Sequence, residues 1–536
     1  MRRGGRTRAL SAQHPNAIPA ATAQRNGDAY TGLAAIAMAA SAVTPGSPAA
    51  VSARGRRTQA RIRAWPTSAV SRTGRMAAAA DAGSARGASI PCPTLRMRRK
   101  SNARGGRAAL LVLVRPMGRP GEMVLLGTSA ALAVILALIL RHAIFLTNDS
   151  MNDYAHVWYV ADQLWSGHGV PVHMPVLAHG RAYAFPYAFI PWTLAALVRP
   201  LLGDWAVTLG LVLGFLAVVA GTLVGFPEMR RPWWAAMVIL NPVLLEGPLL
   251  GQMPFLWAAA FLMFAIAAWR GGRTLLAGVL AGCAGATHPA VLLPLIGILV
   301  LARMRWEPRR RHLLAAYALS LVLAAPAAYF TLASPVFGET SVPRIVANFF
   351  GTVGLRALVP AAPFIGLALQ RTPLARAPLL IVAVLIALNA AFVPLRHDAY
   401  AWRGLMREPD RSLDGFLQSG RFVPGATYRV LSAGDAKYGM YQALRHGAAL
   451  DSEFFPESMA LRSWPSERAY GDFLRRRAVD YVIIYGAYDR GYGTNEHALL
   501  RAMAARGPVS GRVCVRGIEH QPLYDVYAIA RHGCRA

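Results

Sequence analysis

The sequence contains few cysteines and few charged residues for its length. Four Cys among 536 residues cannot form a disulfide framework that replaces a hydrophobic core. Charged residues make up 15% of the chain and hydrophobic residues 55%, which excludes one ordinary soluble domain. No P-loop, GxGxxG, GxSxG or HExxH spacing occurs, so little suggests nucleotide binding, a hydrolase elbow or a zinc protease.

Acidic residues are also scarce, because 26 Asp and Glu face 57 Lys and Arg, a net charge of +31. Such a balance suggests a nucleic-acid-binding protein until its distribution is considered. Residues 1–121 hold 21 of the basic residues against Asp28 and Asp81, and they lack sustained apolar periodicity. This composition predicts a disordered Arg/Ala-rich arm.

Three interpretations of this arm are open: contact with anionic lipid or nucleic acid, targeting, or no function at all, which includes absence from the native protein. Met117 and Met123 both lie just before the first long apolar run, where translation could begin. We therefore favour the third interpretation and expect no nucleic-acid partner.

Long apolar runs follow the arm and predict a polytopic α-helical membrane domain over 122–396. A hydrocarbon core of about 30 Å needs about 20 helical residues. Runs of suitable length or slightly shorter lie near 123–140, 185–202, 205–226, 233–250, 253–269, 274–302, 313–333, 345–369 and 379–395.

Basic residues in the short connections predict which side of the membrane each connection faces. Four connections carry Arg clusters: Arg230 and Arg231; Arg270 and Arg273; Arg303, Arg305, Arg309, Arg310 and Arg311; Arg371 and Arg376. All four lie inside if the proline-rich run 185–202 does not cross and the run 274–302 crosses twice, with a break at 287–289. The sequence thus predicts about nine spans, an outer loop 141–204 and an outer C-terminal domain 397–536.

The C-terminal domain has the pattern of a soluble α/β domain. Segments 427–433, 480–486, 511–518 and 523–530 are rich in β-branched and aromatic residues and predict strands. Helical patterns lie between them, near 466–477 and 495–506. If this domain is extracytoplasmic, a disulfide between Cys514 and Cys534 is allowed.

The outer loop opens with acidic residues directly after the first span. Asp149, Asp153 and His156 are spaced by four and three residues, so a helix would place them on one face. Acids at a membrane boundary are costly unless they are solvated, paired or bound to a cation, which makes these residues functional candidates. The alternative is a solvated loop with an amphipathic interfacial helix.

Several segments resemble the GT-C superfamily, integral-membrane glycosyltransferases that use polyprenyl-phosphate sugars. The similar features are the acid-bearing outer loop with AFPYAFIPW (184–192), the Gly251-Gln252 pair, WRGGR (269–273) and LAGVLAGCAGATHP (276–289). The resemblance covers about 120–400 as architecture and 397–536 more loosely. The chain departs from the pattern at the acids, because Asp149 and Asp153 each follow an Asn and do not form an adjacent pair.

The resemblance implies a general base that accepts the proton of the acceptor hydroxyl, and Asp149 or Asp153 is the candidate. Some relatives use a divalent cation such as Mg²⁺ or Mn²⁺, for which Asp149, Asp153 and His156 could supply ligands. Arg356 could bind the leaving phosphate, or its side chain could extend to the membrane interface without a role in catalysis.

Three further polar residues in apolar segments are candidate substrate-binding residues. Glu246 and Gln252 lie near the predicted outer face, where either could contact a sugar, although Glu246 could instead pair with a structural Arg. His288 lies at the predicted break, where it could bind substrate or be a helix-end histidine that a carbonyl satisfies.

Together these features predict a multi-pass bacterial inner-membrane glycosyltransferase for hexosyl or pentosyl transfer. Its partners would be a polyprenyl-linked sugar donor, membrane lipids and an outer acceptor that is a glycan, a lipid or a protein. Two alternatives are a non-catalytic membrane protein with a partner-binding outer domain, and a transporter of a lipid-linked glycan.

Overall fold

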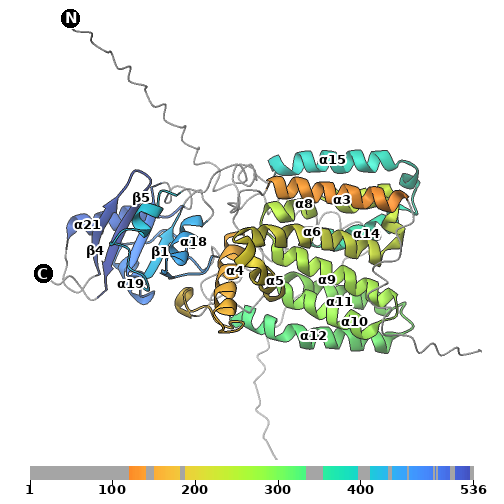
Figure 1. The fold of residues 1–536 in the computed structure, drawn as a ribbon, viewed down its shortest axis with the longest axis horizontal. Helices are drawn as coiled ribbons and strands as arrows, with labels where there is room; N and C mark the ends of the chain where they lie inside the picture. The colour runs from red at the N-terminus through yellow and green to blue at the C-terminus, as the bar shows by residue number, and fades with distance from the viewer. Residues whose placement is uncertain are drawn as a thin grey trace, which may run out of the picture. The chain divides into compact units, whose positions relative to one another are not determined.

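The computed structural model describes residues 120–139, 150–180, 188–333, 354–395, 411–432, 437–454, 458–486, 489, 493–507 and 513–531. Nearly all of the predicted arm lies outside these ranges, so its disorder stays a prediction. Asp149 and Cys534 also lie outside them. The described residues between 120 and 395 are mostly helical, and an α/β domain forms the rest of the described chain (Figure 1).

The helical part consists of apolar helices joined by short connections. Proline occupies the first position of many of these helices, where its missing N–H costs no hydrogen bond. The helices are α3 (Pro120–Ile139), α4 (Ser150–Trp165), η1 (Ala178–Gly180), α5 (Phe189–Leu202), α6 (Trp205–Gly225), η2 (Pro227–Arg230), α7 (Pro232–Ile239), α8 (Pro242–Leu249), α9 (Met253–Arg270), α10 (Thr274–Thr287), α11 (Pro289–Met304), α12 (Arg310–Ala333), α14 (Leu358–Leu369), η4 (Pro373–Arg376) and α15 (Pro378–Leu395).

Three helices among the described residues are long and apolar enough to cross a membrane, namely α6, α9 and α12. Helices α5, α10, α11 and α14 are apolar but 10–17 residues long, and so are the segments Gly127–Ala137 of α3 and Pro378–Ala391 of α15. The polytopic helical class is confirmed, and the count of nine spans stays a prediction.

The run 233–250 differs from the expected single helix, because it breaks at Asn241. The Asn241 side-chain oxygen accepts hydrogen bonds from the backbone N–H groups of Val243 and Leu244, at 3.0 and 3.4 Å. An Asn cap followed by Pro242 starts a new helix, so α7 and α8 are two helices of eight residues each.

The predicted break in 274–302 is confirmed at His288, where α10 ends and α11 begins with Pro289. Trp269, which precedes this helix pair, and Glu307, which follows it, contact each other: the Trp269 indole N–H donates to Glu307 at 3.3 Å. The chain therefore reverses direction at His288, and the two helices are antiparallel.

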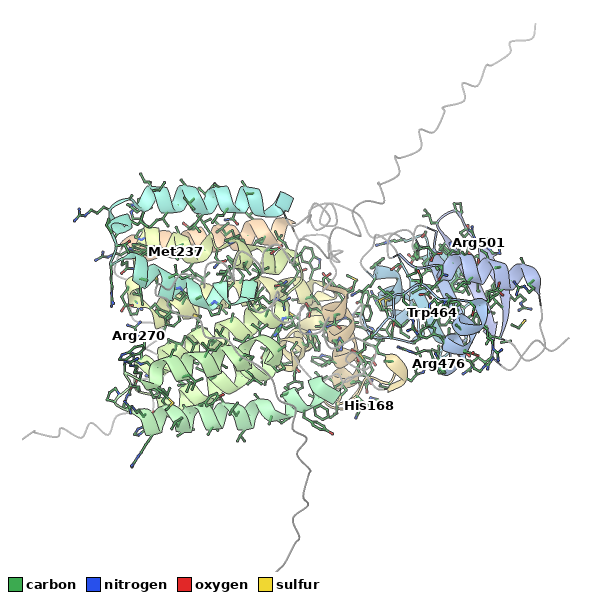
Figure 2. The ribbon with its side chains drawn as sticks, turned by 180° about the vertical axis from the view of Figure 1, so that it is seen from behind. His168, Met237, Arg270, Trp464, Arg476 and Arg501 are labelled. Carbon is green, nitrogen blue, oxygen red and sulfur yellow. The ribbon has the colours of Figure 1, made fainter. Side chains whose placement is uncertain are left out.

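The four basic connections lie together at one end of the helical part. Arg270 forms an ion pair with Glu228 at 2.7 Å, which joins the second connection to the first. The contact between Trp269 and Glu307 joins the second to the third, and Gln370 donates to the Glu228 carbonyl at 3.4 Å. Figure 2 labels Arg270 at this end of the helices. This grouping is the arrangement that a common membrane side requires.

Glycines of the 276–289 segment allow close packing of helices. A Cβ atom on Gly278 would lie 2.9 Å from the Ala316 carbonyl oxygen of α12, and one on Gly282 would lie 2.7 Å from Leu323. Within a membrane the hydrophobic effect does not drive helices together, so their association depends on close packing, which small residues allow. Helix packing therefore explains the glycine spacing in this part of the motif.

The α/β domain contains a five-stranded sheet of order β2-β1-β3-β5-β4. Strands β1, β2 and β3 are parallel, whereas β5 is antiparallel to both β3 and β4. The four predicted strands and both predicted helices are confirmed, and the short strand β2 was not predicted. The elements are α17 (Asp414–Leu417), β1 (Thr427–Leu431), α18 (Tyr438–Arg445), β2 (Ala449–Leu450), α19 (Glu467–Arg476), β3 (Tyr481–Tyr485), α21 (Glu496–Arg506), β4 (Cys514–His520) and β5 (Tyr524–Ala530).

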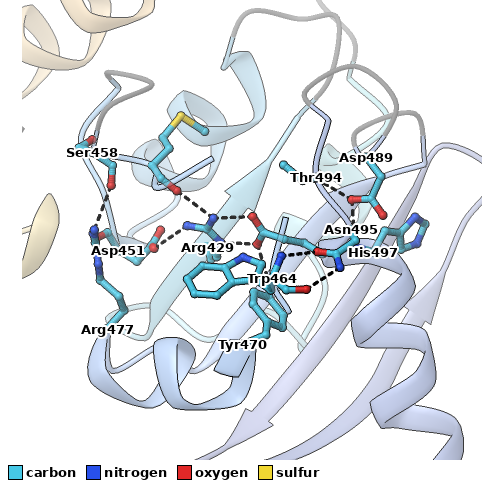
Figure 3. A network of polar contacts seen from close by, with 12 residues as sticks. Arg429, Asp451, Ser458, Trp464, Tyr470, Arg477, Asp489, Thr494, Asn495 and His497 are labelled. Atoms are coloured by element: carbon cyan, nitrogen blue, oxygen red, sulfur yellow. Dashed lines mark hydrogen bonds and ion pairs between the residues drawn. The ribbon is translucent and has the colours of Figure 1, made fainter. Parts of the chain in front are cut away.

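A buried ion cluster connects β1 to α21 and to the residue that follows β2 (Figure 3). Arg429 of β1 is fully buried and donates twice to Glu496 at 2.8 Å and once to Asp451 at 3.0 Å. Burial opposes the charge of Arg429, but the two carboxylates outweigh it and raise the pKa of Arg429. A buried charge is tolerated here because its donors are paired.

Asp525 of β5 is the centre of a second polar cluster. Burial acts to raise its pKa, but hydrogen bonds from neighbouring side chains outweigh burial and lower the pKa of Asp525 to about 2. The neighbours that donate to its carboxylate are His497, Arg501, His520 and Tyr527.

Candidate active site

Helix α4 carries the candidate acid Asp153 and the candidate histidine His156. The N-terminal half of α4 is buried, and Asp153 is 1% exposed. The Asp153 carboxylate accepts a hydrogen bond of 2.7 Å from the indole N–H of Trp192 in α5. The His156 ring stacks on the same indole, with ring centroids 4.1 Å apart. Trp192 therefore contacts both predicted site residues of α4.

His156 is a neutral imidazole at neutral pH. Burial penalises its charged form and lowers the pKa of His156 to about 4, although a backbone hydrogen bond acts in the opposite direction. Its Nδ1 lies 2.8 Å from the Asn152 carbonyl oxygen, which can only accept. The proton therefore lies on Nδ1, and Nε2 carries the lone pair.

Gly251 brings the predicted Gly-Gln pair against the start of α4. Its φ of +71° is the left-handed conformation that glycine adopts without strain. A Cβ atom at Gly251 would lie 2.6 Å from the Ser150 Cα, so a side chain has no space there. Gln252 follows as the half-buried residue before α9, and Glu246 is half-buried on α8. The Gly251 contact places this connection beside the acid-bearing helix.

His288 and Arg356 form a pair at the break between α10 and α11. The Arg356 guanidinium lies 3.0 Å from His288 Nε2, and it lies over the Phe255 ring at 5.6 Å from the centroid. The Phe255 ring also contacts His288 edge-on. The predicted residues His288 and Arg356 therefore lie together, 68 positions apart in sequence.

One backbone hydrogen bond joins the two pairs of contacts. The Ala188 N–H donates to the Thr287 carbonyl at 2.8 Å, which fixes the start of α5 against the end of α10. Ala188 precedes the helix that carries Trp192, and Thr287 precedes His288. The contacts of Asp153 and those of His288 are thus connected through α5.

This group of residues lies at the opposite end of the helices from the Arg clusters. Helix α9 begins at Met253, directly after Gln252, and ends at Arg270; its 18 residues span about 27 Å at 1.5 Å per residue. Helix α10 likewise begins after Arg273 and ends at His288. Basic connections and candidate site residues therefore occupy different ends of the same helices.

The structure joins Asp153 and His156 through Trp192, and it pairs His288 with Arg356. The backbone hydrogen bond from Ala188 to Thr287 links the helices that carry the two pairs, and Gln252 follows the Gly251 contact. Glu246 lies on the neighbouring helix α8, and Asp149 lies outside the described residues. Within the described part of the chain, no group of three or more His, Cys, Asp and Glu side chains could hold a metal ion. The predicted cation site depends on Asp149 and stays a prediction.

Trp192 was not predicted as a site residue. It is the last residue of the proline-aromatic segment 184–192, which was the available signal. Nothing in the sequence places its indole against Asp153, because the two residues are 39 positions apart and on different helices.

No family model matches the sequence, and no curated protein matches it. Among solved structures, ArnT from Cupriavidus metallidurans, bound to undecaprenyl phosphate, is similar with a TM-score of 0.43 and 15% identity, over 75% of this chain and 97% of that chain. The oligosaccharyltransferase AglB from Archaeoglobus fulgidus, in complex with an inhibitory peptide and a dolichol-phosphate, has a TM-score of 0.26 and 13% identity, over 70% of this chain and 50% of that chain.

Proposed function

We propose that the chain is a membrane glycosyltransferase that moves a hexosyl or pentosyl group from a polyprenyl-phosphate-linked donor to an acceptor on the outer face of the bacterial inner membrane. The observation that supports this proposal most is that an acid and a cation lie at the same end of the helices. Asp153 of the outer loop and Arg356 of the last third of the helical part are connected there through Trp192, Ala188 and His288.

The acid is suited to the acceptor side of the reaction. The acceptor hydroxyl oxygen attacks the anomeric carbon of the sugar, and the bond from that carbon to the phosphate oxygen breaks. The carboxylate of Asp153 or Asp149 takes the hydroxyl proton, and the electron pair of the broken bond leaves with the polyprenyl phosphate. Since Asp153 is 1% exposed, its contact with a water-borne acceptor requires side chains around it to move.

The cation is suited to the leaving group. The planar guanidinium of Arg356 matches the oxygens of a phosphate. His288 and Phe255 contact the guanidinium and limit its orientations. A preoriented cation at the position where negative charge develops stabilises the transition state.

Two observations support the placement of the α/β domain on the same side as the outer loop. The Leu450 N–H of β2 donates to the Val176 carbonyl of the loop at 2.7 Å, and the Tyr441 hydroxyl of α18 donates to Asp204 at 2.9 Å. Cys514 is disulfide-bonded, which is usual for an oxidising compartment outside the cytoplasm.

The test is transfer of radiolabelled sugar from polyprenyl-phosphate donors to membrane acceptors by the Asp149→Asn and Asp153→Asn variants. Loss of transfer in at least one variant, by about 100-fold or more, is expected from removal of a general base. The matched control is Asp162→Asn, because Asp162 is an exposed acid of the same helix. Wild-type transfer in both variants would overturn the proposal and favour a non-catalytic protein or a transporter.

A further inference from the structure

Trp192 is held in place from several directions. Its side chain is 1% exposed, and its backbone N–H donates to the Ala188 carbonyl at 2.9 Å. The hydrogen bond from Ala188 to Thr287 ties this first turn of α5 to the break before His288. The indole therefore has little freedom relative to either half of the candidate site.

The indole makes two different contacts with α4. Its N–H donates to Asp153 Oδ1 at 2.7 Å, and its face stacks on His156 with 18° between the ring planes. A hydrogen bond of this length to a carboxylate is charge-assisted and directional. The stacked face fixes the plane of the His156 ring in the same way.

We infer that Trp192 is a positioning residue that orients the Asp153 carboxylate for proton transfer. This inference rests on the proposed function, in which Asp153 is a general base. The hydrogen bond to Oδ1 restricts rotation of the carboxylate and leaves Oδ2 as the oxygen that would accept the hydroxyl proton. A misoriented base loses rate at the chemical step, because general-base catalysis requires hydrogen-bond geometry at the abstracted proton.

The N–H of Trp192 and its ring have different roles, which two kinds of replacement can distinguish. Trp192→Phe keeps an aromatic face for His156 but removes the hydrogen bond to Asp153. The matched control is Trp257→Phe in α9, because the Trp257 indole N–H also donates inside the helical part, to the Gly210 carbonyl at 2.9 Å. This hydrogen bond of Trp257 ends on a backbone oxygen and involves no candidate site residue.

The experiment measures kcat and KM of the purified full chain with radiolabelled polyprenyl-phosphate hexose and pentose donors. Trp192→Phe is expected to lower kcat roughly 10- to 100-fold, the range for a lost hydrogen bond to a charged group, and to leave the donor KM nearly unchanged. Trp257→Phe is expected to leave both constants near the wild-type values. A fall in the donor affinity alone, or equal effects of the two variants, would overturn the inference.

A second replacement keeps the test valid if Trp192→Phe folds poorly. Replacement of Trp192 by 3-benzothienylalanine preserves the shape of the ring system and removes only the N–H donor. It is expected to give the same loss of kcat, whereas wild-type kcat would overturn the inference. The proposed function is tested by other variants: it fails, and this inference with it, if Asp153→Asn and Asp149→Asn both retain full transfer. If only the Trp192 replacements retain wild-type kcat, this inference fails and the proposed function stands.

Discussion

Replacement of Arg429 by Met is expected to unfold the α/β domain at much lower denaturant concentration. The guanidinium is buried and donates to Glu496, Asp451 and the Met459 carbonyl (Figure 3). Without it, two buried carboxylates lose their common cation. Breaking one side of a buried ion pair costs about 3–5 kcal/mol, which is roughly a 100- to several-thousand-fold change in the folding equilibrium.

The measurement is pulse proteolysis of the full chain in urea, with detection of the C-terminal domain. For a slope of about 1.5–2 kcal/mol/M, this loss lowers the unfolding midpoint by about 1.5–3 M. The control is Arg475→Met, because Arg475 forms a 3.4 Å pair with Asp472 in which both side chains are about two-fifths exposed. Such pairs contribute about 1 kcal/mol or less.

A triple replacement tests whether the unpaired carboxylates cause the loss of stability. Arg429→Met combined with Glu496→Met and Asp451→Leu removes both uncompensated charges, and it is expected to restore most of the lost midpoint. An Arg429→Met midpoint equal to that of Arg475→Met would refute the reasoning. Failure of the triple variant to recover stability would show that packing around Arg429, and not charge pairing, carries the effect.

Three further outcomes are expected. Gly251→Ala should lower the unfolding free energy by about 1–3 kcal/mol in thermal melts, because the φ of Gly251 is positive and Ser150 occupies the position of the added Cβ. The control is Gly127→Ala, where no heavy atom lies within 4 Å of the added Cβ, and equal melting temperatures for the two variants would contradict this expectation. Since folding lowers the pKa of Asp525 from 3.8 to about 2, the stability that its carboxylate contributes is present above pH 3.8 and is lost as the pH falls toward about 2. Asp525→Asn should therefore reduce the change in melting temperature between these two pH values, and an unchanged pH dependence would contradict this. Alkaline phosphatase fused at Arg231 should be inactive and a fusion after Arg396 active, and the reverse result would break the predicted topology.

Local patterns in the sequence predicted much of the fold. The strands β1, β3, β4 and β5 follow from β-branched and aromatic runs between turn residues, and the break at His288 follows from Pro289 together with the Arg clusters at both ends of 274–302. These signals are local, or they depend on charge counts that a single chain displays directly.

The remainder depends on contacts between distant segments. The split of 233–250 needed the cap formed by Asn241, which a hydropathy average hides. The two-residue strand β2 is defined by its neighbour β1 and not by its own composition. The candidate acids and His288 were found by residue type, but the indole of Trp192, which contacts Asp153 and His156, has no sequence pattern of its own.

The most direct test of glycosyl transfer is release of polyprenyl phosphate from radiolabelled polyprenyl-phosphate hexose and pentose donors by the purified chain in lipid nanodiscs, with membrane extract as acceptor. The wild-type chain is expected to convert at least one donor, and a variant that combines Asp149→Asn with Asp153→Asn is expected to lose conversion by about 100-fold or more. Conversion of none of the donors by the wild type, or equal conversion by the double variant, would contradict a glycosyltransferase that uses these acids.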